Sequence, residues 1–139
     1  MPSPVKFTGG CACGAVSYAC SSDALAMVFC HCRDCQRAGG SGGSPTVVVP
    51  RAAFALVRGE PCIHERAAES GATASRAFCA ACGSPLFAWS SARPEVLGIR
   101  AGSLDDPSAF RPQAHVWTEA AQPWDWLAPA LPRFAKSRR

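Results

Sequence analysis

Long apolar segments are missing from this sequence of 139 residues. No hydrophobic run approaches the roughly 20 residues that a membrane-spanning helix needs, because arginines interrupt every candidate. The N-terminus also lacks a basic stretch followed by an apolar core, so we expect no signal peptide. We therefore expect a cytoplasmic protein that does not use a membrane.

Regular repeats are missing as well. The 12 glycines follow no period of three, which excludes a collagen-like chain. Charged residues make up 17% of the chain and hydrophobic residues 48%, the balance of a globular protein. The 12 glycines and 12 prolines exceed average usage and argue against a helical bundle. We predict a single domain over residues 1–139, mainly β, with short strands joined by many turns.

What the sequence does have is nine cysteines. Cys11 and Cys13 are too close in sequence to bridge each other comfortably, and so are Cys30 and Cys32. Clusters with gaps of one or two residues suit several sulfurs that meet at one metal ion. In a reducing cytosol the thiols stay available as ligands, so metal binding is favoured over disulfides.

Alternation of apolar and polar residues predicts where the strands lie. Two short strands are expected within residues 4–20, and a third over 25–30 that runs directly into a cysteine cluster. The further expected strands are Thr46–Val49, Phe54–Arg58, Cys62–Arg66, Ser75–Phe78, the segment around Leu86, Phe87 and Trp89, and Val96–Arg100.

The segments between these strands also carry expectations. Arg33–Ala38 is predicted to form one helical turn that Gly39 and Gly40 stop. The polar segment Glu65–Thr73 is expected to be an exposed hairpin loop. The C-terminal tail, with its three tryptophans, is expected to pack as irregular chain over the sheet; these are Trp117, Trp124 and Trp126.

Four cysteines predict a closed structural zinc site: Cys11, Cys13, Cys79 and Cys82. Both pairs are followed by glycine, which lets backbone amides approach the thiolates. Four sulfurs complete a tetrahedral zinc. Such a metal would attach the first hairpin to a later part of the sheet.

A second cluster, Cys30, Cys32 and Cys35, supplies three sulfurs within six residues and no obvious fourth ligand. Three protein ligands and an open position are typical of a catalytic zinc. A distant side chain could instead close the site and make it structural; the candidates are His64, His115, Cys20 and Cys62.

Other residues near the clusters receive plainer interpretations. His31, between two ligands, is expected to face away from the metal as a partly exposed histidine, and His115 to be a hydrogen-bonded structural one. Cys20 and Cys62 are expected to be small buried hydrophobes. Arg37, beside Asp34 and Gln36, could attract a carboxylate or simply be solvated. The Gly39–Gly43 loop could approach a bound cosubstrate closely.

The net charge argues against a nucleic-acid partner. The formal charge of +4 counts every cysteine as neutral. Seven thiolates on two zinc ions would lower it to about +1. The remaining basicity gathers in a short solvated tail, at Arg133, Lys136, Arg138 and Arg139. Nucleic-acid binding is therefore poorly supported.

Four ordered motifs resemble the glutathione-dependent formaldehyde-activating enzymes and their relatives, which include centromere protein V. The motifs are Gly10-Cys11-Ala12-Cys13-Gly14-Ala15-Val16-Ser17-Tyr18, Cys30-His31-Cys32-Arg33-Asp34-Cys35-Gln36-Arg37, Phe78-Cys79-Ala80-Ala81-Cys82-Gly83-Ser84, and a final group of Gly102-Ser103-Leu104-Asp105-Asp106-Pro107, His115-Val116-Trp117 and Pro123-Trp124. They span nearly the whole chain.

The resemblance implies a β-tent fold of short antiparallel strands with one or two short helical turns. It implies a structural zinc at the first and third cysteine motifs and a catalytic zinc at the middle one. The implied activity is that of a carbon–sulfur lyase that joins formaldehyde to glutathione, giving S-hydroxymethylglutathione. The expected cofactors are two zinc ions per chain, with glutathione or another thiol as cosubstrate and an aldehyde as the second small molecule. The alternative is a non-catalytic module with two structural zincs that binds a protein or a nucleic acid.

Overall fold

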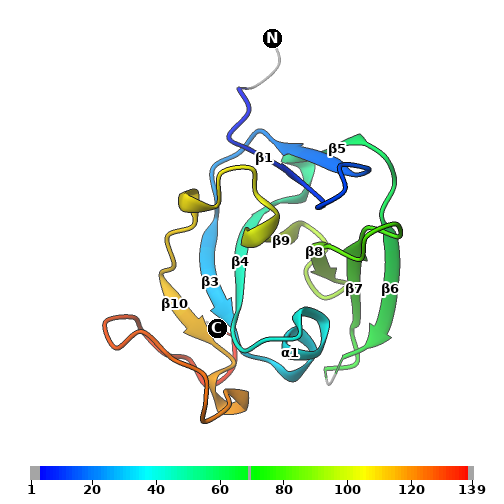
Figure 1. Ribbon diagram of the computed structural model, residues 1–139. Helices are drawn as coiled ribbons and strands as arrows, with labels where there is room; N and C mark the ends of the chain where they lie inside the picture. Colours follow the sequence, from blue (N-terminus) through cyan, green and yellow to red (C-terminus); the bar gives the residue numbers. More distant parts are fainter. Residues whose placement is uncertain (1–3, 69, 138–139) are drawn as a thin grey trace.

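The protein was analysed as a computed structural model, which describes residues 4–68 and 70–137 and is mainly β (Figure 1). Within these residues the strands are β1 (Phe7–Gly10), β2 (Ser17–Cys20), β3 (Ala26–Cys30), β4 (Ser44–Pro50), β5 (Phe54–Arg58), β6 (Cys62–Ala67), β7 (Thr73–Phe78), β8 (Pro85–Ser90), β9 (Val96–Arg100) and β10 (Ala114–Val116). The α-helix is α1 (Arg33–Gly39), and the 3₁₀ turns are Arg51–Ala53, Ala101–Ser103, Pro107–Ala109 and Thr118–Ala120. No helix in the described part of the chain is long and apolar enough to span a membrane.

The strands form two sheets. The small sheet has the order β1-β2-β5, and the large sheet has the order β10-β3-β4-β9-β8-β7-β6. The strands pair antiparallel, as expected, with one exception: β10 pairs parallel with β3, so that Val116 lies opposite Cys30. Because the two strands run in the same direction, the chain leaves both of them at the same edge. The C-terminal segment and the second cysteine cluster are therefore neighbours.

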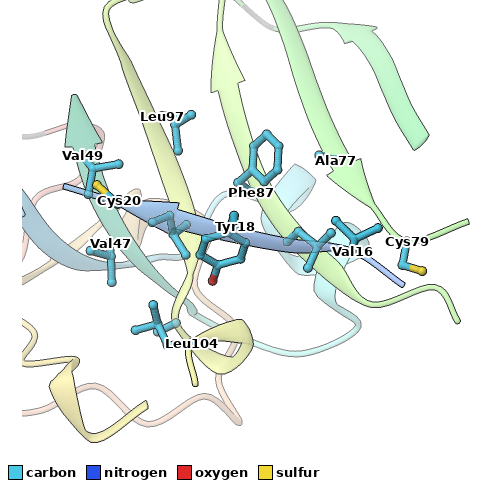
Figure 2. Close-up of a cluster of buried hydrophobic side chains, with 13 residues drawn as sticks. Val16, Tyr18, Cys20, Val47, Val49, Ala77, Cys79, Phe87, Leu97 and Leu104 are labelled. Carbon is cyan, nitrogen blue, oxygen red and sulfur yellow. The ribbon is translucent and has the colours of Figure 1, made fainter. Parts of the chain in front are cut away.

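The core lies between the two sheets. Figure 2 shows β2 running across the strands of the large sheet, with Tyr18 near its centre. Tyr18 is 1% exposed, and Val47 of β4 and Ile99 of β9 are fully buried. Burial of such side chains contributes about 1.5–3 kcal/mol each. The Tyr18 hydroxyl hydrogen-bonds Ser103 Oγ at 2.6 Å, which satisfies its buried polar end.

The predicted helical turn is confirmed, and its ends have clear causes. Cys32 is its N-cap, and the helix stops at Gly40, whose φ of 70° is left-handed and suits glycine. The predicted loop over Glu65–Thr73 is wrong at both ends, because β6 continues to Ala67 and β7 begins at Thr73. An edge strand pairs through its backbone on one side only, so all of its side chains can be exposed, as those of β6 are.

Of the three tryptophans of the tail, Trp117 packs on the buried cluster of Val28, Ala114 and Val116, whereas the other two do not pack, contrary to the prediction. Trp124 and Trp126 are 68% and 73% exposed. The residue between them, Asp125, points inward instead and accepts a hydrogen bond from the backbone N–H of Gly43 at 2.8 Å. This segment is therefore anchored by a carboxylate rather than by its indoles.

Candidate metal centres and the pocket beside them

The first cysteine cluster joins the two sheets. Cys11 and Cys13 follow β1 of the small sheet, and Cys79 and Cys82 follow β7 of the large one. The four Sγ atoms lie within 4.8 Å of one another. Gly14 and Gly83, at the ends of the two turns, have left-handed φ angles of 82° and 77°. Glycine lets both turns close tightly enough to point two sulfurs each toward a common centre.

Hydrogen-bond donors favour the thiolate at two members of this four-cysteine cluster. At Cys13, the backbone N–H of Ala15 is outweighed by the contacts with Cys11 and Cys82, which raise the pKa of Cys13 to about 11. The backbone N–H of Val16 donates to Cys11 Sγ at 3.2 Å and lowers the pKa of Cys11. The hydroxyl of Ser84, 3.1 Å from Cys82 Sγ, lowers the pKa of Cys82 to about 5, with help from the Ser84 backbone N–H. Hydrogen bonds to the charged form stabilise it. Cys11 and Cys82 are thus prepared to release their protons to a metal ion.

The second cluster forms where β3 ends and α1 begins. The Sγ atoms of Cys30, Cys32 and Cys35 lie within 4.8 Å of one another. Cys32 caps the helix with its sulfur, which accepts from the backbone N–H of Cys35 at 3.2 Å. The helical turn brings Cys35 back over Cys32, and Cys35 is buried while the other two are half-buried. All three sulfurs therefore converge on one point without help from a distant segment.

Two arginines of the large sheet reach this three-cysteine cluster. Arg76 of β7 and Arg100 of β9 each direct an Nη2 toward Cys35 Sγ at 3.8 Å. The thiols of Cys30 and Cys32, and after them the two guanidinium groups, hold the pKa of Cys35 well below its usual range. Neighbouring sulfurs raise the pKa of Cys30 in turn. The thiolate form is therefore favoured at Cys35, beside the arginines.

His31 contradicts the prediction of a partly exposed histidine, because it is 1% exposed. Its Nε2 lies 2.8 Å from Nδ1 of His115, and its Nδ1 lies 2.8 Å from Asp125 Oδ2. The contact with Asp125 lacks the alignment of a hydrogen bond and is electrostatic. The side chain faces away from the metal cluster, as expected, but into protein rather than into water.

The proton positions in this histidine pair follow from the donors around it. The backbone N–H of Ala128 donates to Nε2 of His115 at 3.0 Å, so that nitrogen is unprotonated. Nδ1 of His115 then carries the proton and donates it to Nε2 of His31. Burial lowers the pKa of His115, which favours its neutral form. The prediction of a hydrogen-bonded structural histidine at position 115 is confirmed.

The glycine loop before β4 packs against these groups rather than against an open site. A Cβ at Gly43 would lie 2.5 Å from Cε1 of His31, and a Cβ at Gly42 would lie 2.4 Å from Cγ of Asp125. Such distances are too short for any side chain, so the two glycines allow the loop to close over His31. Gln36 adds a second brace, because its Nε2 donates to the carbonyls of His31 and Ala120 at 2.7 and 2.9 Å.

A surface pocket of about 700 Å³ opens beside the three-cysteine cluster at Cys32. Its charged walls include Arg33 and Arg66 as well as Glu119. Trp117 also lines it and has a left-handed backbone, with a φ of 56°, which is uncommon for a residue with a side chain. Its other lining residues are Asp34, Ala67, Ala68, Ser70, Ala74, Arg76, Ser90 and Ala120. The pocket offers both charge signs next to a sulfur.

The other candidate residues fall in several places. Cys20 is fully buried, as predicted, but Cys62 is exposed on edge strand β6, which contradicts its prediction. None of the four candidate closing ligands joins the three-cysteine cluster among the described residues. Arg37 is exposed in the last turn of α1 and does not line the pocket beside Cys32. Asp34 pairs instead with Arg66 at 3.2 Å.

Both clusters suit zinc by their donor chemistry. Zinc binds cysteine thiolates, and N–H, hydroxyl or guanidinium donors beside the sulfurs stabilise the thiolate form. The four-sulfur set can complete a tetrahedron, whereas the three-sulfur set leaves one position for another ligand. Each cluster could hold a metal ion. The assignment of these seven cysteines as zinc ligands stays a prediction.

Sequence reasoning missed Arg76, Arg100 and Asp125. A signal for the two arginines was present: each alternates with buried neighbours on its strand, so it lies on the face opposite the core. An arginine on the half-buried face of an inner strand indicates that a polar or negatively charged group lies next to it. Asp125 had no such signal, because it lies in irregular chain between two prolines and two tryptophans.

Comparisons with known proteins agree with this architecture. A crystal structure of a Rhodobacter sphaeroides protein shares the fold with a TM-score of 0.60, at 18% sequence identity, and covers 92% of this chain and 99% of that chain. The sequence profile described as "Glutathione-dependent formaldehyde-activating enzyme" matches residues 6–120, which include both cysteine clusters. This chain belongs to the glutathione-dependent formaldehyde-activating enzyme family.

Proposed function

We propose that the protein is a zinc-dependent enzyme of the carbon–sulfur lyase type that forms or cleaves the adduct of a thiol and an aldehyde. The observation that carries the proposal is the three-cysteine cluster at the rim of a pocket of about 700 Å³. Four sulfurs elsewhere could close around a structural metal ion, so a second set of only three sulfurs beside a pocket favours chemistry. The family name supports glutathione as the thiol and formaldehyde as the aldehyde.

The reaction balances without an oxidant or a reductant. The thiol sulfur forms a bond to the aldehyde carbon, the carbonyl becomes a hydroxyl, and the thiol proton ends on that oxygen. Cleavage is the reverse. Zinc held by Cys30, Cys32 and Cys35 would supply positive charge that favours the deprotonated thiol. The protein's part is to place the nucleophile and the aldehyde next to each other.

The pocket walls suit a thiol that carries charges of its own. Glutathione has two carboxylates and one ammonium group. Arg33 and Arg66 offer planar guanidinium groups to carboxylates, and Glu119 offers an acceptor to an ammonium. Arg66 is held in place by its ion pair with Asp34. These contacts would orient the thiol with its sulfur toward Cys32.

Cobalt substitution tests the proposal directly. Glutathione added to the cobalt-loaded full chain should change the visible absorption of the three-cysteine cluster, and labelled formaldehyde should give S-hydroxymethylglutathione, seen by NMR, faster than without protein. Cys32→Ala should abolish both signals. Cys62→Ala, which removes an exposed cysteine outside both clusters, is the matched control and should preserve both.

One outcome favours the alternative function. If glutathione and simple thiols leave the spectrum unchanged while cobalt occupies both clusters, the middle site is closed by a protein ligand. The proposal would then fail, and the protein would be a binding module with two structural metals.

A further inference from the structure

Two arginines of the large sheet place positive charge beside the three-cysteine cluster. Arg76 and Arg100 come from β7 and β9, with β8 between them in the large sheet, and converge on one sulfur, Cys35 Sγ, at 3.8 Å each. Both are half-buried. A neutral thiol would leave the charge of both guanidinium groups without compensation, whereas thiolates would compensate it.

The charge of this arginine pair is directed at the sulfurs and at nothing acidic. Among the ion pairs of the described residues, neither arginine has a carboxylate partner. Arg100 is further fixed by its Nη1, which donates to the Thr46 hydroxyl at 2.7 Å on the neighbouring strand. That hydroxyl donates in turn to the Ser44 carbonyl at 3.1 Å, so the arginine is held by an oriented acceptor.

The charges can be counted. A divalent zinc with three thiolates has one net negative charge, and a fourth thiolate brings it to two. The two arginines, which stay protonated in proteins, balance that state completely. With a neutral ligand in the fourth position, the same half-buried arginines leave one positive charge in excess. In a half-buried setting such an imbalance is poorly screened by water.

We propose that Arg76 and Arg100 are positioning residues that make the three-cysteine centre prefer an anionic fourth ligand, a thiolate, over a neutral one. The inference rests on the proposed function, and it adds that the two arginines favour binding of the cosubstrate as a thiolate. Both arginines of the pair reach the sulfur of Cys35, and Arg76 also lines the pocket together with Arg33 and Arg66.

The test compares two ligands on the cobalt-loaded full chain. 2-Mercaptoethanol binds as a thiolate and has no carboxylate, and imidazole binds as a neutral ligand; both are followed by the visible spectrum. Arg76→Gln and Arg100→Gln should each weaken thiol binding by about tenfold or more, the effect of losing a hydrogen-bonded charge beside an ion. Imidazole binding should change by less than about twofold. Arg76→Lys and Arg100→Lys keep the charge and should recover most of the thiol affinity.

Arg93→Gln is the matched control, because Arg93 lies in the turn after β8 and pairs with Glu95 at 3.5 Å. It should leave both affinities unchanged. Equal weakening of thiol and imidazole in the glutamine variants, or no weakening of either, would overturn the inference while leaving the proposed function intact. If the unmutated protein takes imidazole but no thiol, or neither ligand, the proposed function fails and the inference with it. If a glutamine variant does not fold, its lysine counterpart decides: lost thiol selectivity despite the retained charge refutes the charge argument.

Discussion

Gly43→Ala is the substitution that best tests how the second metal cluster is held in shape. Gly43 lies in the loop before β4, against the ring of His31, and His31 lies between Cys30 and Cys32 in the sequence. An added Cβ would lie 2.5 Å from Cε1, 2.9 Å from Nε2 and 3.0 Å from Nδ1 of that ring. Ordinary carbon contacts are about 3.5–4.0 Å, so the ring or the loop must move by about 1 Å.

The ring has little freedom to move. His115 holds its Nε2 and Asp125 lies against its Nδ1, both at 2.8 Å. Overpacking of this kind costs about 1–3 kcal/mol, and a strained or broken hydrogen bond adds about 1 kcal/mol. Alanine also reduces the conformational entropy of the unfolded chain, which offsets about 0.4–1 kcal/mol of this loss of stability. We therefore expect the free energy of unfolding to fall by roughly 1–3 kcal/mol.

Gly39→Ala supplies the matched control. It makes the same chemical change in the preceding helix end, where the nearest heavy atom to the new Cβ, Ser41 Oγ, lies at 3.6 Å. It should leave stability unchanged or raise it slightly. Thermal and denaturant unfolding measure the difference, and cobalt titration reports the second cluster. Gly43→Ala should weaken cobalt binding there and spare the four-cysteine cluster. Equal stability and equal cobalt affinity for the two variants would refute the packing argument.

Three further predictions concern the metals and one histidine. Elemental analysis of the reconstituted protein should give two zinc ions per chain; a value of one or none would remove the basis of the two-site interpretation. Cys82→Ala breaks the link between the two sheets and should lower the thermal midpoint strongly or make the protein insoluble, whereas Cys32→Ala should lose one zinc and keep the fold; equal losses of stability would mean that both clusters are structural. The pKa of His115 is lowered from 6.5 in the folded protein, so its stabilising effect is present above that pH and is lost as the pH falls below it. The unmutated protein should therefore lose its advantage in unfolding free energy over His115→Gln as the pH falls. A difference that stays constant with pH would contradict the lowered pKa of His115.

Local sequence carried the information for much of the fold and for both clusters. Strands such as Phe54–Arg58 and Val96–Arg100 were predicted with their observed ends, because alternation and flanking turn residues are local signals. The helical turn from Arg33 was predicted from its glycine stop. The three-cysteine cluster needs only one strand end and one helical turn. Each half of the four-cysteine cluster needs one tight turn with a glycine, although the two sheets must meet to bring the halves together. Such short-range patterns determine which sulfurs can point the same way.

Only the tertiary structure decided what surrounds those sulfurs. His31 looked like a solvated residue because nothing near it in sequence could cover it; the parallel return of β10 beside β3 brings His115 over it. Asp125 and Arg100 reach the same region from irregular chain and from a distant strand. Cys62 resembled Cys20 in sequence but lies on an edge strand, where its side chain is exposed. Burial and charge compensation depend on which segments become neighbours, and that neighbourhood is a property of sheet order, which no local pattern encodes.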